Sequence, residues 1–181
     1  CITTKITPTA DAETMAERIE QSLRSLQLKH IDCLGIHGIN TPQHLDWVTN
    51  PNGCMAAVRS AIDQGKIGHV GFSTHATLEI ILETIATNQF EFINLHYYTF
   101  FQRNEAAIAL AHEKDMGIFI ISPADKGGML YTPPDSLRQT CAPFTPLELN
   151  YRFLLSDRRI TTLSVGPATP EELQAPLATA D

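Results

Sequence analysis

The sequence predicts an α/β fold, and within that class an incomplete (β/α)8 TIM barrel with about six βα units. Three observations support this prediction. Short β-branched segments alternate with longer amphipathic ones, each strand–helix repeat takes roughly 30 residues, and the polar residues of the strands share one face. No low-complexity stretch and no linker divides the chain, so residues 1–181 are expected to form one partial barrel domain.

Six segments are expected to form strands, because each is rich in β-branched residues and is bounded by turn-forming ones. They are Ile2–Lys5, Ile31–His37, Ile67–Ser73, Phe90–His96, Gly117–Ser122 and Ile160–Gly166. Strands that alternate with helices through right-handed crossovers form a parallel sheet covered by helices.

Apolar residues at helical spacing predict the helices between these strands. The first helix follows Asp11, a favourable N-terminal residue, and the helix of Met55, Val58 and Ile62 stops at Gly65, which suits a C-terminus. Further helices are expected around Leu78–Ile85 and Ile108–Ala111, at Pro146–Ser156 and at Glu171–Leu177. The segments Asn40–Gly53 and Pro133–Pro146 are predicted to be loops.

The distribution of polar residues distinguishes a barrel from an open doubly wound sheet. Successive strand residues point to opposite faces. Leu34 and Val70 therefore lie on one face, while His37 and Ser73 lie on the other face at the ends of their strands. An open sheet should be apolar on both faces, so one face of small and polar residues fits a barrel interior. A barrel needs eight strands and six are visible, so we expect the chain to be incomplete.

Composition narrows the classes of function. The formal net charge of −7 argues against a nucleic-acid partner, because phosphate backbones need clustered Lys and Arg. No apolar stretch is long enough to span a membrane, and the start of the chain does not resemble a signal peptide. The four cysteines form no CxxC pair, so reduced thiols in a cytoplasmic protein are the simplest expectation. The oligomeric state stays open.

Residues at the carboxyl ends of the strands are candidates for chemistry, because barrel enzymes build their sites at that rim. Lys5 and His37 end the first two strands, and Ser73 and Asn94 lie at or near the ends of the next two. Each of these residues could also be an ordinary surface or structural residue.

A glycine-rich segment follows the fifth strand and could approach a phosphate. In Ser122–Gly128, Gly127 and Gly128 allow close backbone contact, and Lys126 adds a positive charge. Gly166 follows the last strand and precedes a short helical segment, which is the usual place for a phosphate in barrels. The segment matches neither the P-loop nor the Rossmann fingerprint.

Taken in order, these motifs resemble the aldo-keto reductase family. The matching segments are Thr4-Lys5, Leu34–His37, Gly71–Ser73, Asn94–Tyr98, Ile121–Gly128 and Gly166 with Pro170–Leu173. They are most similar to the branch whose longer members carry a C-terminal ferredoxin-like iron–sulfur extension. The resemblance covers the chain from barrel strand 3 to the helix after strand 8, which implies truncation at both ends.

The resemblance implies NADPH-dependent reduction of an aldehyde or ketone, with NADH not excluded and no metal expected in this chain. In the family a Tyr donates a proton as hydride arrives, a Lys lowers the pKa of that Tyr, an Asp pairs with the Lys, and a His orients the carbonyl. By match, the catalytic residues here are Lys5 and His37. The cofactor would be bound by Ser73 and Asn94 at the nicotinamide carboxamide and, along the phosphates, by Ser122, Lys126, Gly127 and Gly166.

This sequence departs from the family pattern at several positions. The family's Asp and Tyr have no counterpart among the 181 residues, so we expect the isolated chain to be inactive. Ile121 stands where many members have a Tyr that stacks on the nicotinamide. No Arg follows the last strand to bind a 2′-phosphate, so the choice between NADP and NAD stays open, as does the identity of the small carbonyl substrate.

Two other functions stay open. The side chains of His37, His75 and His96 could all reach one barrel mouth, and three histidines would form the zinc site of a metal-dependent hydrolase. No carboxylate accompanies them at the strand ends, which argues against this hypothesis. The chain could also be a non-catalytic remnant that binds a nucleotide weakly or not at all.

Overall fold

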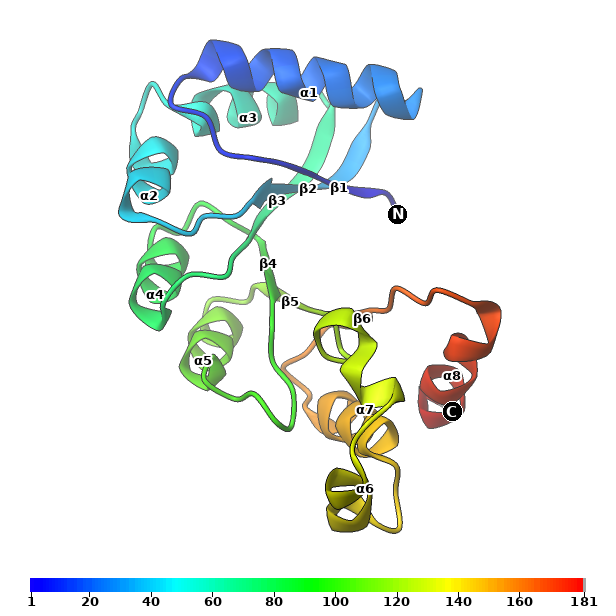
Figure 1. The fold of residues 1–181 in the computed structure, drawn as a ribbon. Coiled ribbons are helices and arrows are strands. Elements are labelled where there is room, and N and C mark those ends of the chain that lie inside the picture. Colours follow the sequence, from blue (N-terminus) through cyan, green and yellow to red (C-terminus); the bar gives the residue numbers. More distant parts are fainter. Residues whose placement is uncertain (181) are drawn as a thin grey trace.

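The computed structural model describes residues 1–180, in which six parallel strands form one sheet in the order of the sequence (Figure 1). The sheet curls into part of a barrel, with the helices outside and an open concave side, which confirms the predicted fold class. Asp181, the last residue of the predicted domain, lies outside the described residues. The strands are β1 (Thr3–Ile6), β2 (Ile31–His37), β3 (Ile67–Ser73), β4 (Phe92–Leu95), β5 (Gly117–Ile121) and β6 (Thr162–Ser164).

Helices follow most of the strands and cover the convex face (Figure 1). The first begins where the sequence predicts, because the Asp11 carboxylate accepts a hydrogen bond from the Thr14 backbone N–H at 2.8 Å. None of the described helices is long and apolar enough to cross a membrane. The helices are α1 (Ala12–Leu26), α2 (Pro42–Thr49), α3 (Cys54–Asp63), α4 (Leu78–Ala86), α5 (Glu105–Glu113), α6 (Asp135–Cys141), α7 (Pro146–Ser156) and α8 (Gln174–Ala180), with short 3-10 helices η1 (Lys126–Tyr131) and η2 (Pro170–Leu173).

The two segments predicted as loops each contain a helix, so those predictions were wrong. Helix α2 begins at Thr41, whose hydroxyl accepts a hydrogen bond from the His44 N–H at 3.2 Å, and proline occupies its first turn. Helix α7 begins in the same way: the Thr145 hydroxyl accepts a hydrogen bond from the Glu148 N–H, and Pro146 occupies the first turn. Helix α6 has seven residues, which is too short for an apolar period to be recognised.

The last strand is shorter than predicted. Ile160–Gly166 was expected to be a strand, but β6 covers only Thr162–Ser164. It lies at the edge of the sheet and pairs only with β5, so its backbone hydrogen bonds are formed on one side alone. Gly166 therefore lies in the loop beyond the strand.

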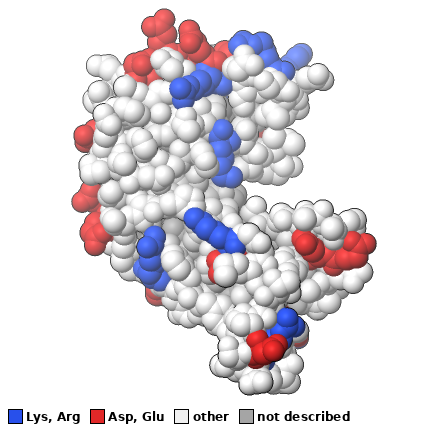
Figure 2. Space-filling model, viewed as in Figure 1, with Lys and Arg blue, Asp and Glu red and all other residues white. Residues whose placement is uncertain are grey.

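The two faces of the sheet differ as the sequence predicts. Leu34 and Phe72 have no exposed surface, and helices pack over them on the convex side. Burial of such side chains stabilises the fold by about 1.5–3 kcal/mol each. Lys5, His37 and His69 belong to the other parity and are exposed on the concave side. The curled sheet leaves the molecule C-shaped, with an opening between its N-terminal and C-terminal parts (Figure 2).

Aromatic rings and glycines fill the floor of the concave side. The Phe92 ring lies against Gly71, where an added Cβ would come within 2.3 Å of a ring carbon. Phe92 also stacks on Phe119, with ring centroids 5.0 Å apart. These contacts lie below the strand ends, so the polar residues one layer higher are left at the rim.

Candidate active site and cofactor cavity

Strand register places the predicted rim residues together. His37 pairs with Ser73, and Ser73 pairs with Asn94, so the three lie in one row across β2, β3 and β4. Lys5 pairs with Gly35, one layer below His37 on the same face. The topology therefore brings all four predicted strand-end residues to one side of the sheet.

His37 is held by the Ser73 hydroxyl. The His37 Nδ1 lies 2.9 Å from the Ser73 Oγ, and the backbone N–H of Gly38 donates to the same oxygen at 3.2 Å. When Ser73 donates to Nδ1, the neutral imidazole carries its proton on Nε2. That atom is then able to donate a hydrogen bond to a carbonyl oxygen.

The side chain of Lys5 crosses the neighbouring strand at a glycine. A Cβ on Gly35 would lie 3.3 Å from the Lys5 Cγ, closer than most such contacts. The glycine thus makes room for the lysine stem on the concave face, where Lys5 is exposed.

Asn94 offers a hydrogen-bond donor at the centre of the row. The residue is 3% exposed, and its Nδ2 has no hydrogen-bond partner among residues 1–180. A buried donor without a partner costs about 1–3 kcal/mol, and a carbonyl or carboxamide oxygen would satisfy it.

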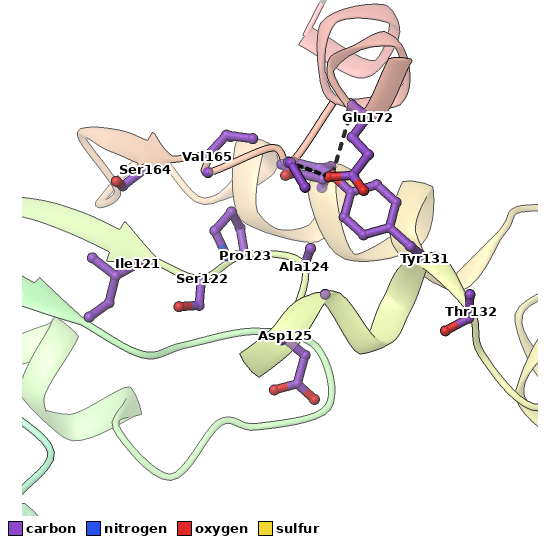
Figure 3. Close-up of a pocket in the computed structure, with 15 residues that line it drawn as sticks. Ile121, Ser122, Pro123, Ala124, Asp125, Tyr131, Thr132, Ser164, Val165 and Glu172 are labelled. Carbon is purple, nitrogen blue, oxygen red and sulfur yellow. Dashed lines mark hydrogen bonds between the residues drawn. The ribbon is translucent and has the colours of Figure 1, made fainter. Parts of the chain in front are cut away.

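A cavity of about 660 Å³ lies at the carboxyl ends of β5 and β6. We call it the first cavity. In Figure 3, Ile121 and Ser164 lie at one end of it, and Tyr131 and Glu172 lie at the other. The Tyr131 hydroxyl donates to the Glu172 carbonyl at 3.1 Å, and the Ala168 N–H donates to the Glu172 carboxylate at 2.8 Å. These two hydrogen bonds hold in place the wall of the first cavity that Tyr131 and Glu172 form.

Three of the four residues predicted to lie along the phosphates line the first cavity, namely Ser122, Gly127 and Gly166. Gly127 and Gly128 have φ of +70° and +72°, a left-handed conformation that favours glycine. No heavy atom lies within 4 Å of a Cβ built on Gly127 or Gly166, so both glycines border open space. Backbone N–H groups in such turns bind anions.

Lys126, the fourth, lies in the wall of a separate cavity of about 310 Å³, which we call the second cavity. Its lining comes from the loops after β3, β4 and β5 and includes His75, His96, Tyr98, Arg103, Asn104, Asp125 and Lys126. The two histidines are candidate site residues from the sequence, whereas Tyr98, Arg103 and Asn104 are not. The sequence feature that could have indicated them is the polar pair Arg103-Asn104, which follows an aromatic segment.

His96 and Tyr98 form the buried part of the second cavity. The His96 Nδ1 lies 2.5 Å from the Tyr98 hydroxyl, and the His75 and His96 ring centroids are 4.7 Å apart. Burial lowers the pKa of His96 to about 4 and raises the pKa of Tyr98 to about 12.

The three histidines of the hydrolase hypothesis do not form one site. His75 and His96 lie together, but His37 is paired with Ser73 on the concave face. Within residues 1–180, no three His, Cys, Asp or Glu side chains gather closely enough to hold a metal ion. The geometry therefore does not support this hypothesis.

Comparison with solved structures finds close similarity of fold. An aldo-keto reductase from Bacillus halodurans, AKR11C1 in its holo form, superposes with a TM-score of 0.82 at 20% identity, over 99% of this chain and 65% of that one. A putative aldo-keto reductase from Pseudomonas aeruginosa superposes with a TM-score of 0.74 at 19% identity, again over 99% of this chain and 65% of that one. This chain thus spans about 65% of the length of these solved proteins. No curated protein matches it.

Among protein-family models, that of the aldo/keto reductase family matches residues 1–140, which is most of the chain. The order of the strands and the curled sheet agree with that match. The chain belongs to the aldo/keto reductase family.

Proposed function

We propose that this chain forms the cofactor-binding side of an NAD(P)H-dependent oxidoreductase that reduces an aldehyde or ketone. The observation that carries the proposal is the first cavity, a space of about 660 Å³ at the ends of β5 and β6 whose lining includes three glycines. It opens beside a row of polar rim residues, as a site for an extended dinucleotide requires.

The residues of the first cavity fit a phosphate-bearing cofactor. Ser122, Gly127 and Gly166 would lie along the phosphates, with contacts made mainly by the backbone. Asn94 would donate its unpaired Nδ2–H to the carboxamide oxygen. Ser73 lies beside it, although its hydroxyl is engaged by His37 and Gly38. Lys126 is left out of this set, since it lines the second cavity.

The catalytic part of the proposal concerns Lys5 and His37. The cofactor supplies the hydride when it is bound. His37 donates from Nε2 to the carbonyl oxygen, where negative charge develops, and so lowers the barrier. Lys5 lowers the pKa of a neighbouring tyrosine and makes it a better proton donor. That tyrosine and its partner Asp match no position in these 181 residues, so the chain alone is proposed to be inactive.

Some parts of the proposal rest on the relatives. A holo form of the Bacillus halodurans protein has been solved, which supports binding of a cofactor by this fold. The choice between NADPH and NADH, the carbonyl substrate and membership of the iron–sulfur branch remain predictions. A cytoplasmic location is proposed from the four cysteines, which are all free thiols.

The test is calorimetric titration of the chain with NADPH and with NADH. We expect saturable binding of at least one nucleotide at one site, and the two curves give the preference directly. Lack of binding by both would contradict the proposal and favour the non-catalytic remnant.

A second assay follows the absorbance of NADPH in the presence of a panel of aldehydes and ketones. We expect no carbonyl-dependent oxidation by the isolated chain. Stoichiometric oxidation would contradict the inactivity while leaving the cofactor site in place.

A further inference from the structure

The second cavity lies outside the predicted catalytic row, between the loops that follow β3 and β4, and the start of η1 borders it. Helices α4 and α5 both begin beside it, after Thr77 and Asn104. Neither helix has a side-chain hydrogen bond at its N-cap. The dipoles of these two helix N-termini contribute positive potential near this cavity, which the first-turn residues Glu79 and Glu105 partly offset.

Charged side chains give the cavity walls a positive balance. Arg103 and Lys126 line it, and the only carboxylate in its lining is Asp125, which accepts a hydrogen bond from the Lys126 backbone N–H at 2.6 Å. The Arg103 guanidinium lies 4.9 Å from the centre of the Phe101 ring, which restrains it. In the view of Figure 2, several Lys and Arg side chains lie across the middle of the molecule with few acidic ones among them, while both kinds lie at the top edge.

Two buried polar atoms in the cavity wall have no partner within residues 1–180. The residue His96 is 7% exposed and its Nε2 makes no hydrogen bond. Asn104 is 3% exposed; its Nδ2 donates to the His96 carbonyl at 2.8 Å, which leaves its Oδ1 unpaired. Unpaired buried polar atoms are costly, so their presence in one wall points to a polar ligand.

We propose that the second cavity binds the phosphate group of a small molecule. Arg103 provides a planar guanidinium that matches phosphate geometry, and Lys126 provides a second charge from the opposite loop. The Nε2–H of His96 donates to a phosphate oxygen, and Asn104 Oδ1 accepts from a hydroxyl of the ligand. A volume of about 310 Å³ holds a phosphate together with a small organic group.

Phosphate fits this cavity better than a metal ion does. The positive charges of Arg103 and Lys126 repel a metal ion. Burial lowers the pKa of His75 and of His96, and these two cations lower both further. The neutral imidazoles can still donate hydrogen bonds to an anion. The proposal does not depend on the dinucleotide site, because Arg103, His96 and Asn104 take no part in the first cavity.

The experiment is a nitrogen-15 NMR titration of the histidine rings with inorganic phosphate and, separately, with ribose 5-phosphate. The rings of His75 and His96 report on the second cavity alone. We expect their signals to shift with saturation. The variant Arg103→Gln should weaken binding about tenfold through loss of a charge-assisted hydrogen bond. The matched control Arg138→Gln, an exposed arginine on α6, should leave it unchanged.

Either phosphate source supports the proposal, and the two are told apart by affinity. Tighter binding of ribose 5-phosphate indicates an organic phosphate, whereas equal binding indicates free phosphate. The proposal is overturned if neither compound moves the two ring signals, if Arg103→Gln binds as tightly as the wild type, or if zinc moves the signals and phosphate does not.

Discussion

The two cavities of this chain are built in opposite ways. The first has three glycines in its lining, two of them in a left-handed conformation, and it borders the edge strand β6. The second is lined by side chains, with a buried histidine–tyrosine pair at its centre and an arginine and a lysine in its wall. Glycines leave the backbone accessible, so a site that they line depends on backbone conformation, whereas a site lined by charged and polar side chains changes with each substitution.

The two cavities should therefore be sensitive to different changes. The first cavity should respond to a change of backbone conformation or to bulk added at a glycine. The second should respond to charge and pH. Two residues connect them: Asp125 lines both cavities, and the side chain of Asn150 bonds to the loop after β4 and to the loop after β5.

The largest effect is expected from Asn150→Ala. Asn150 is fully buried on α7; its Oδ1 accepts from the Thr99 N–H at 2.8 Å, and its Nδ2 donates to the Pro123 carbonyl at 2.5 Å. Its removal leaves the buried Pro123 carbonyl and the partly buried Thr99 N–H unpaired, so the free energy of unfolding should fall by about 3 kcal/mol. Urea denaturation measures this. The control Asn52→Ala, at an exposed position, should change stability by less than about 0.5 kcal/mol.

The next largest effect is expected at low pH, where His96 in the second cavity should make the folded protein less stable. In the unfolded chain His96 takes up a proton as the pH falls below its ordinary pKa of 6.5, but in the folded protein its pKa is about 4. Between these values the folded state binds fewer protons, so stability falls with pH, by about 2 kcal/mol from pH 7 to pH 5.

Urea midpoints at the two pH values, for the wild type and for His96→Gln, isolate this contribution. The variant should lose the His96 part of the pH dependence, while carboxylates with lowered pKa such as Asp157 act equally in both proteins. The same pH dependence in both proteins would show that His96 is protonated as easily in the folded state as in the unfolded one.

The smallest effect is expected from Ser73→Ala, on the rim outside both cavities. The change removes the hydrogen bond to His37 Nδ1 and should cost about 1 kcal/mol of stability. Nitrogen-15 chemical shifts of the His37 ring should show a mixture of tautomers in place of one. An unchanged ring spectrum would mean that Ser73 does not orient His37. Ser60→Ala, on the surface of α3, is the control.

Sequence patterns predicted the regular part of the fold well. The bounds of β2, β3 and α7 agree with the structure, because each has a clear apolar period or a clear start. Helix α2 was missed although Thr41-Pro42 resembles the start of α7, since the helix carries only one buried residue, Val48, and so has no apolar stripe.

The sites were predicted unequally. Residues at strand ends could be placed from chain order alone, because parallel strands bring their carboxyl ends to one rim. The second cavity could not be predicted from chain order. Tyr98, Arg103 and Asn104 lie in a loop whose path depends on tertiary contacts such as those of Asn150. The prediction that Lys126 lies along the cofactor phosphates stays untested; in the structure Lys126 is part of the lining of the second cavity.

Binding of the dinucleotide in the first cavity can be tested with a pair of glycine variants. Gly127 and Gly65 both have a φ of +70° and no heavy atom within 4 Å of an added Cβ, but only Gly127 lines the cavity. Gly127→Val and Gly65→Val should therefore lose similar stability, roughly 1–2 kcal/mol. NADPH titration should show binding weakened at least about tenfold in Gly127→Val alone. Equal affinities in the two variants would contradict the account.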